Sequence, residues 1–159
     1  MRIAKRLKEY LEENKIAYTH CTHRLAYTAQ EVAAAQHVPG REMVKTIILK
    51  ADEQFVMVVL PALWKIDMNA LRDELPYRKI ELATEREFAW LFPDCEVGAM
   101  APFGTLYDLP MYADKTLSAN DEIVFNAGTH VDTIRMKYRD FETLVQPKII
   151  DVATLAMKE

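Results

Sequence analysis

Two apolar segments that lie close together in the sequence restrict the fold most. Residues 43–50 read Met-Val-Lys-Thr-Ile-Ile-Leu-Lys, residues 54–60 read Gln-Phe-Val-Met-Val-Val-Leu, and only Ala-Asp-Glu separates them. Both segments have strand composition, and the polar break between them is long enough for a turn. The second segment is apolar at successive positions, which is typical of a strand covered on both faces. We therefore predict two strands joined by a turn, the second of them central in its sheet.

One residue of the first strand does not suit an apolar environment. Alternate residues of a strand share a face, which places Lys45 beside Met43, Ile47 and Leu49. An ammonium group there costs free energy unless it has a partner. Lys45 either packs its alkyl stem and extends its charged end to water, or presents a cation to a pocket. In a pocket it would hold a phosphate, a carboxylate or a polarised carbonyl, or act as a base if desolvation lowers its pKa.

The rest of the chain mixes short helices with short strands. Capping-box spacing at Thr28–Glu31 and Thr84–Glu87 indicates two helix starts. This order favours the α+β class over regular βαβ winding. With half of its 159 residues hydrophobic, the chain is predicted to form one domain. Helices are expected at residues 2–14, 28–35, 67–75, 84–92 and 139–145, and further strands at 16–21, 109–113, 122–126, 131–137 and 148–152.

Composition limits the partners and the compartment. The net charge of −4 provides no overall basic field, so a nucleic-acid partner would have to be held by a local patch. The N-terminus lacks an apolar signal core, and the longest apolar run, residues 55–64, is about half of the ~20 residues that a membrane span requires. The two cysteines, Cys21 and Cys95, form no recognisable disulfide framework. We expect a cytoplasmic protein with no membrane partner.

A loop rich in small residues is the second candidate for chemistry. Residues 98–104 read Gly-Ala-Met-Ala-Pro-Phe-Gly. Glycine lets the backbone approach a ligand closely, and Pro102 fixes the path of the chain. Such a loop can present free N–H groups to a carbonyl oxygen. An ordinary tight loop that leads into a strand has the same pattern, so both interpretations stay open.

Two histidines and a thiol within four residues, His20, Cys21 and His23, are candidate metal ligands. Ligands at this spacing need a further partner elsewhere in the chain, and Cys95 and His130 supply no recognisable second half. A metal-dependent hydrolase built on these residues therefore remains an alternative, while our prediction includes neither a metal nor a cofactor.

Taken in chain order, these features resemble the YbaK / prolyl-tRNA-synthetase-associated domain family. The resemblance extends from about residue 3 to residue 152. Its most specific parts are the strand lysine and the GxxxP loop about fifty residues later. Members of that family hydrolyse mischarged aminoacyl-tRNA. The matching segments are Tyr18–His23, the helix at Thr28–Ala35, Val44-Lys45-Thr46, Gly98–Gly104 and Asn126-Ala127-Gly128.

The resemblance implies a fold and a set of site residues. The fold would be a compact, mixed, mostly antiparallel β-barrel-like sheet surrounded by helices. Lys45 matches the functional lysine of the family, and Gly98 and Pro102 match its GxxxP loop. His130 falls near a substrate-sizing position, and His23 matches a histidine before the second helix. Residues 1–159 would form a single, free-standing editing domain that acts in trans.

The expected reaction is hydrolysis of the aminoacyl ester on a mischarged tRNA, a tRNA-Pro or a similar one. The partners would be the aminoacylated 3′ end of tRNA and a synthetase or translation factor. A non-catalytic module that binds a nucleotide, an amino-acid derivative or a protein is the alternative. Because they are adjacent in sequence to the proposed site, five further residues are expected to bind substrate: Met43, Ile47, Ala99, Met100 and Phe103.

Overall fold

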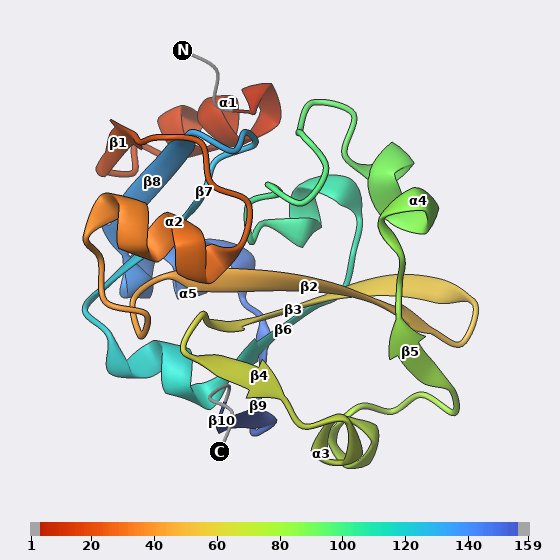
Figure 1. Ribbon diagram of the computed structural model, residues 1–159. Coiled ribbons are helices and arrows are strands. Elements are labelled where there is room, and N and C mark those ends of the chain that lie inside the picture. The colour runs from red at the N-terminus through yellow and green to blue at the C-terminus, as the bar shows by residue number, and fades with distance from the viewer. Residues whose placement is uncertain (1–3, 156–159) are drawn as a thin grey trace.

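A five-stranded sheet forms the centre of the computed structural model, which describes residues 4–155 (Figure 1). The strand order is β5-β2-β3-β6-β9. The predicted hairpin of β2 and β3 pairs along its whole length, and β3 is central. β6 runs parallel to β3, and β9 runs parallel to β6. The strands are β2 (Val44–Ala51), β3 (Gln54–Pro61), β5 (Ile80–Leu82), β6 (Met111–Asp114) and β9 (Lys148–Ile150).

Two smaller sheets complete the β-structure of the described residues. β1 (Tyr18–Thr22), β8 (Asp132–Lys137) and β7 (Glu122–Asn126) form an antiparallel sheet in that order. β4 (Trp64–Ile66) pairs with β10 (Ala153–Leu155). The predicted α+β class with a mixed, mostly antiparallel sheet is confirmed.

The two edges of β2 are covered very differently. β3 pairs with every residue of β2, whereas β5 covers only Leu49–Ala51 on the other edge. At the start of β2, Met43 forms an isolated parallel bridge with Val124 of β7, which joins the two larger sheets. Within residues 4–155, no strand pairs with Lys45–Ile47 on this edge.

Five α-helices of the described chain surround the sheets (Figure 1). Both predicted capping boxes form, with Thr28 before α2 and Thr84 before α4. No helix within residues 4–155 has the length and apolar character needed to cross a membrane. The helices are α1 (Lys5–Glu13), α2 (Ala29–Gln36), α3 (Met68–Glu74), α4 (Glu85–Phe88) and α5 (Tyr138–Val145), with 3₁₀ turns η1 (Ala89–Leu91), η2 (Gly104–Tyr107) and η3 (Lys115–Ala119).

The strand predicted at 148–152 forms, but it ends two residues earlier than predicted because the chain turns there. β9 ends at Ile150 and joins the central sheet, while β10 starts at Ala153 and pairs with β4. The buried carboxylate of Asp114 accepts hydrogen bonds from the N–H groups of Val152 and Ala153 at 2.7 and 2.9 Å. These bonds hold the chain between the two strands. β4 and β5 were not predicted, and residues 2–3 of the first predicted helix lie outside the described residues.

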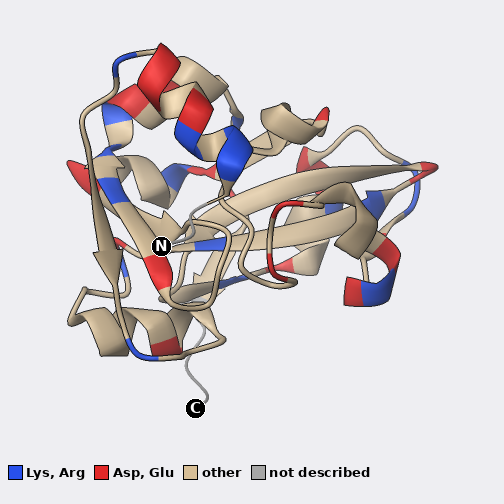
Figure 2. Ribbon diagram, turned by 90° about the horizontal axis from the view of Figure 1, so that it is seen from above, with Lys and Arg blue, Asp and Glu red and all other residues tan. Residues whose placement is uncertain are grey.

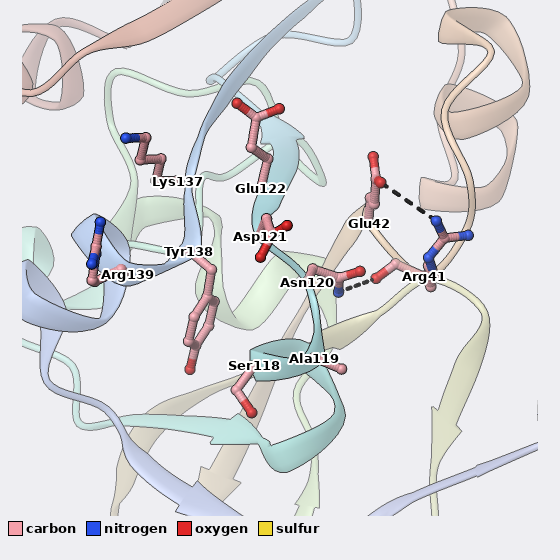
Figure 3. Close-up of a pocket in the computed structure, with 10 residues that line it drawn as sticks. All are labelled: Arg41, Glu42, Ser118, Ala119, Asn120, Asp121, Glu122, Lys137, Tyr138 and Arg139. Atoms are coloured by element: carbon pink, nitrogen blue, oxygen red, sulfur yellow. Dashed lines mark hydrogen bonds and ion pairs between the residues drawn. The ribbon is translucent and has the colours of Figure 1, made fainter.

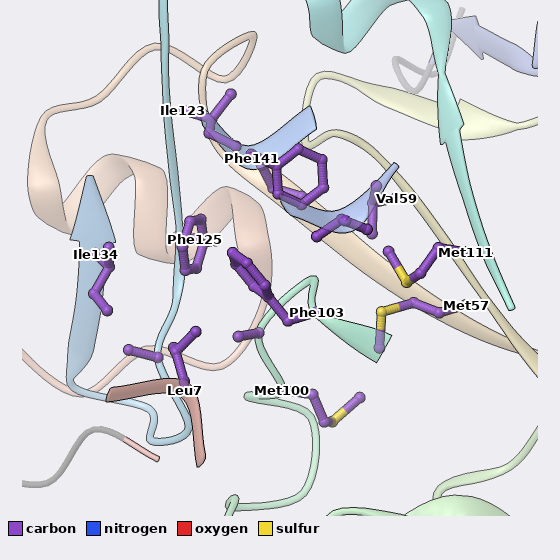
Figure 4. Close-up of a cluster of buried hydrophobic side chains, with 14 of the residues drawn as sticks. Leu7, Met57, Val59, Met100, Phe103, Met111, Ile123, Phe125, Ile134 and Phe141 are labelled. Carbon is purple, nitrogen blue, oxygen red and sulfur yellow. The ribbon is translucent and has the colours of Figure 1, made fainter. Parts of the chain in front are cut away.

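Phe103 lies at the centre of the largest hydrophobic cluster (Figure 4). Its ring centroid is 5.5 Å from those of both Phe125 and Phe141, and no part of Phe103 is exposed. Phe103 thereby fixes the end of the loop that begins at Gly98 to the core formed by β7 and α5. A smaller separate cluster contains Met43 and Val124 with residues of α2.

We expect Phe103→Ala to lower the free energy of unfolding by about 3–5 kcal/mol, because it removes a fully buried ring and leaves a cavity. Urea unfolding followed by circular dichroism measures this change. Trp90→Ala is the control, since that side chain is 70% exposed, and it should change stability by about 0.5 kcal/mol or less. Equal losses in the two variants would contradict the central position of Phe103.

Candidate active site around Lys45

A cleft of about 380 Å³ opens along the uncovered edge of β2. Its walls come from β2, the start of α2, the segment from β5 to α4, the loop after η1 and the last residue of β7. Segments distant in the sequence therefore meet at this edge. The lining residues whose side chains or backbone groups could bind or activate a substrate are Lys45, Thr46, Glu85, Gly98, Met100 and Asn126.

Lys45 is half-buried in this cleft without a compensating charge. No carboxylate of residues 4–155 lies within ion-pair distance of its Nζ atom. Burial alone lowers the Lys45 pKa from its ordinary value, because desolvation disfavours the charged form. Lys50, on the same strand, donates to Glu87 Oε2 at 2.8 Å, and this interaction raises the Lys50 pKa. The strand thus carries one paired lysine and one unpaired lysine.

Ile47 and Lys45 also border a second, smaller cavity. It has a volume of about 220 Å³, and its walls include Lys65 and Leu82. Lys45 therefore lies between two adjoining spaces, of which the smaller one is mostly lined by apolar side chains.

Gly98 occupies the third position of a tight turn. Ala99 donates its N–H to the carbonyl of Glu96 at 3.0 Å, and the φ angle of Gly98 is +87°. These two features are those of a type II turn, in which glycine is favoured at this position. A Cβ atom on Gly98 would lie 3.3 Å from Oε2 of Glu85. A residue with a side chain would also be strained at this positive φ angle. The turn therefore requires glycine for its backbone conformation.

Two backbone donors of the loop remain unused. The N–H of Ala99 is engaged in the turn, but the N–H groups of Gly98 and Met100 have no acceptor within residues 4–155. Both residues line the cleft that contains Lys45. Preorganised N–H donors and a cation together can stabilise negative charge that develops on a carbonyl oxygen.

His130 supports this loop from behind and does not line the cleft. Its backbone N–H donates to Glu96 Oε1 at 2.7 Å, and its Nε2 donates to the carbonyl of Val97 at 2.9 Å. Its ring lies 4.7 Å from that of Tyr27. The N–H of Gly128 also donates to the carbonyl of Ala99 at 2.9 Å. The turn that follows β7 therefore holds the loop in place by several hydrogen bonds.

The sequence-predicted residues divide between the cleft and the core. Lys45, Ile47, Gly98 and Met100 line the cleft. Ala99, Pro102, Phe103 and Met43 are buried behind it, with Met43 in the small cluster under α2. His23 lies away from the cleft, where its N–H donates to the carbonyl of Val131 at 2.8 Å and its Nδ1 donates to that of Arg24 at 2.6 Å.

The residues of the metal alternative have other partners. His20 Nε2 lies 2.8 Å from Asp132 Oδ1, and Thr129 donates to the other oxygen of Asp132 at 2.6 Å. Cys21 is a free, half-buried thiol on β1. Within residues 4–155, no three His, Cys, Asp or Glu side chains are grouped as a metal site would need.

Thr46, Glu85 and Asn126 also line the cleft and were not predicted as site residues. Glu85 was assigned only to a helix start, and Asn126 only to the end of a strand and to a segment that matches the family. Asn126 carried a usable signal, because an amide that follows Ile-Val-Phe in a strand is expected to be buried and to need a partner. Its proximity to Lys45 depends on the Met43–Val124 bridge, for which the sequence has no pattern.

A larger depression of about 840 Å³ lies between the start of β7 and the start of α5 (Figure 3). Some of its polar groups have partners within the depression: Asn120 donates to the carbonyl of Arg41 at 2.7 Å, and Arg41 lies 3.8 Å from Glu42. It contains none of the predicted site residues. Figure 2 shows basic and acidic residues interspersed over helices and turns, so charge does not favour one face in that view.

The fold and the cleft together define an α+β domain with a lysine and backbone donors at one site. Residues 23–144 match the aminoacyl-tRNA editing domain family, and the chain belongs to this family. The family assignment made from the sequence is therefore confirmed, and the family is one of aminoacyl-tRNA editing domains.

Individual relatives agree with this assignment. The chain is 25% identical to the multifunctional Ser/Thr-tRNA deacylase ProXp-y of Escherichia coli (strain K12), over 92% of this chain and 90% of the relative. It is 29% identical to the proline--tRNA ligase of Bacillus cytotoxicus over 57% of this chain, but only 16% of the ligase. The chain therefore corresponds to a small part of that ligase.

Solved structures share the fold. A candidate trans-editing enzyme for prolyl tRNA synthetase superposes with a TM-score of 0.80 at 20% identity, covering 95% of this chain and 96% of that one. Hypothetical protein APE2540 superposes with a TM-score of 0.83 at 19% identity, covering 94% of this chain and all of that one.

We expect Lys45→Met to be more stable than the wild type at pH 7. Because burial lowers the Lys45 pKa, the folded protein binds this proton less tightly than the unfolded chain does. The resulting loss of folding stability is fully present below the folded-state pKa and disappears as pH rises towards 10.5, the ordinary pKa of lysine. Urea unfolding at pH 7 and pH 10 should show a stability gain in the variant that shrinks at the higher pH.

Lys50→Met is the matched control, because it removes a lysine that has an ion pair. It should be no more stable than the wild type at pH 7. If Lys45→Met were clearly less stable than the wild type at pH 7, Lys45 would have a stabilising partner and the description of the cleft would be wrong.

Proposed function

We propose that this chain hydrolyses the aminoacyl ester of mischarged tRNA in trans, that residues 1–159 act as one editing domain, and that the cleft at the edge of β2 is the active site. One observation carries the proposal. Lys45, which forms no ion pair with any of residues 4–155, shares the cleft with the N–H groups of Gly98 and Met100, which have no acceptor in that range. A cation and fixed donors are what a developing oxyanion requires.

The aminoacyl ester needs little activation, because it is already a reactive bond. In the proposed reaction, water attacks the carbonyl carbon, and the carbonyl oxygen becomes an oxyanion. The N–H groups of Gly98 and Met100 bind that oxygen, and the Lys45 ammonium stabilises its charge or anchors a neighbouring phosphate. The bond to the ribose oxygen then breaks, and that oxygen takes the proton that the attacking water loses. The adjacent ribose hydroxyl can assist the attacking water.

Selectivity among amino acids would come from the side chains that line the cleft. Ile47 and Met100 supply apolar lining, and Thr46 adds a hydroxyl. Apolar pockets discriminate by only ~10–200-fold per methylene, so selectivity among small side chains would be moderate. The relative named as a Ser/Thr-tRNA deacylase supports serine and threonine esters as candidates beside alanine and cysteine.

The charge of the chain supports weak binding of tRNA on its own. With a net charge of −4, affinity would come from a few local contacts. We propose that a synthetase or a translation factor delivers the mischarged tRNA, with tRNA-Pro as the first candidate, since proline--tRNA ligases are among the relatives. The cytoplasm is the compartment in which these partners would meet.

We expect Lys45→Met to lower the rate of deacylation by at least about 10²-fold, since it removes the charge that stabilises the transition state and keeps the bulk of the side chain. The assay uses Ala-, Cys-, Ser- and Thr-tRNA(Pro) under single-turnover conditions. Lys50→Met is the control on the same strand and should retain nearly the wild-type rate.

Hydrolysis by the wild type that is unaffected by Lys45→Met would contradict the role of Lys45. No hydrolysis of any ester, with a synthetase added, would contradict the enzyme and support a binding module that uses the same cleft.

Gly98→Ala should reduce the rate of deacylation by at least about 10-fold while leaving unfolding cooperative. The added Cβ lies only 3.3 Å from Glu85 Oε2, and the φ angle of +87° is unfavourable for alanine. The turn must therefore shift, and its N–H donors lose their alignment with the substrate. Rates and urea unfolding of the same preparation measure both effects. Gly40→Ala is the control, because a Cβ there makes only ordinary contacts of 3.5 Å or more. A fully active Gly98→Ala would exclude these donors from the reaction.

A further inference from the structure

Asn126 is the one cleft residue whose buried polar group lacks a partner within residues 4–155. The side chain is only 8% exposed, and its Oδ1 accepts no hydrogen bond there. A buried unpaired acceptor is costly and is normally satisfied by another group. The terminal torsion of asparagine is soft, so the carboxamide can turn towards a donor that enters the cleft. Asn126 is thus suited to accept a hydrogen bond from a ligand.

The strand register places Asn126 near Lys45. Met43 bridges Val124, and each of these is followed two residues later by a cleft residue, Lys45 on β2 and Asn126 on β7. Residues two apart on a strand share a face. Lys45 and Asn126 therefore flank the place where the two strands separate.

The open edge of β2 adds a second acceptor. Ala83 donates to the carbonyl of Ile48 at 3.0 Å, so the backbone groups of Ile48 point to the β5 edge. Backbone groups alternate between the two edges of a strand, so those of Thr46 point the same way. No strand covers Thr46 on that edge within the described residues. Its carbonyl oxygen is therefore directed to the cleft.

The lining of the cleft includes two side chains of opposite charge. Glu85 lines it, forms no ion pair within residues 4–155 and approaches Gly98 closely. Lys45 supplies the opposite charge. A ligand that carries both an ammonium group and a carbonyl oxygen would place the ammonium at the two acceptors and the oxygen at Lys45, and the carboxylate of Glu85 would favour the ammonium.

We propose that Asn126 and the Thr46 carbonyl bind the α-ammonium group of the aminoacyl moiety, with Glu85 adding a favourable field. This inference rests on the proposed function, because it specifies how the same cleft orients the ester. The ammonium lies at Asn126 and the carbonyl oxygen lies at the loop donors and Lys45. Esters whose amino group is acylated or replaced by hydroxyl are then poor ligands, so the domain distinguishes aminoacyl-tRNA from N-blocked and peptidyl esters.

The test compares two stable amides, 3′-(L-alanylamino)-3′-deoxyadenosine and its L-lactyl counterpart, which replaces the ammonium by hydroxyl. Calorimetric or NMR titration at pH 6.5 keeps the α-amine charged. The wild type should bind the alanyl compound at least about 10-fold more tightly, as expected for a charge-assisted hydrogen bond. Asn126→Leu should bind both compounds about equally, and Asn126→Asp should keep the preference for the ammonium.

Asn126→Leu is expected to fold, because it replaces an unsatisfied buried amide by an apolar group of similar size. Loss of the preference in Asn126→Leu together with its retention in Asn126→Asp supports the proposal. A wild type without preference, or an Asn126→Leu variant that keeps it, overturns the proposal. Preference in binding without deacylation of any ester would contradict the proposed function alone.

Discussion

The uneven pairing of β2 is the constraint on which the site depends. β3 covers the whole of one edge, while β5 and β7 cover only the two ends of the other. Between these two ends, a short length of β2 is not paired on this edge, and its backbone groups and the side chain of Lys45 line a cleft. If β5 extended along β2, these backbone groups would form hydrogen bonds with β5, and β5 would occupy the cleft. The open edge therefore places the lysine and the loop donors at the same point.

The elements around this edge are held together by hydrogen bonds that do not involve the ammonium of Lys45 or the amide oxygen of Asn126. The turn after β7 binds the loop through Gly128 and His130, and it also receives the start of α1, where Ala4 donates to the carbonyl of Ala127 at 2.7 Å. The ammonium of Lys45 and the amide oxygen of Asn126 have no partner within residues 4–155, although both are partly or wholly buried. Groups of this kind lower stability, and their concentration at one cleft indicates a binding role.

The sequence was sufficient for local features and for the family, and insufficient for long-range placement. The β2–β3 hairpin, both capping boxes and the class of fold follow from periodicity and short motifs. Strand pairings between distant segments leave no such signal, so the Met43–Val124 bridge and the cleft position of Asn126 were not predicted. Phe103 illustrates the same limit: adjacency to a motif suggested a cleft position, and packing between Phe125 and Phe141 places it in the core.

The central claim is that Lys45 and the Gly98 turn form one site for the ester end of aminoacyl-tRNA. A crystal structure with 3′-(L-alanylamino)-3′-deoxyadenosine tests this most directly. We expect the carbonyl oxygen of the alanyl group to lie within hydrogen-bond distance of the N–H of Gly98 or Met100, with Lys45 Nζ on the same side. Binding of the alanyl group elsewhere, for example in the depression beside Tyr138, would contradict it.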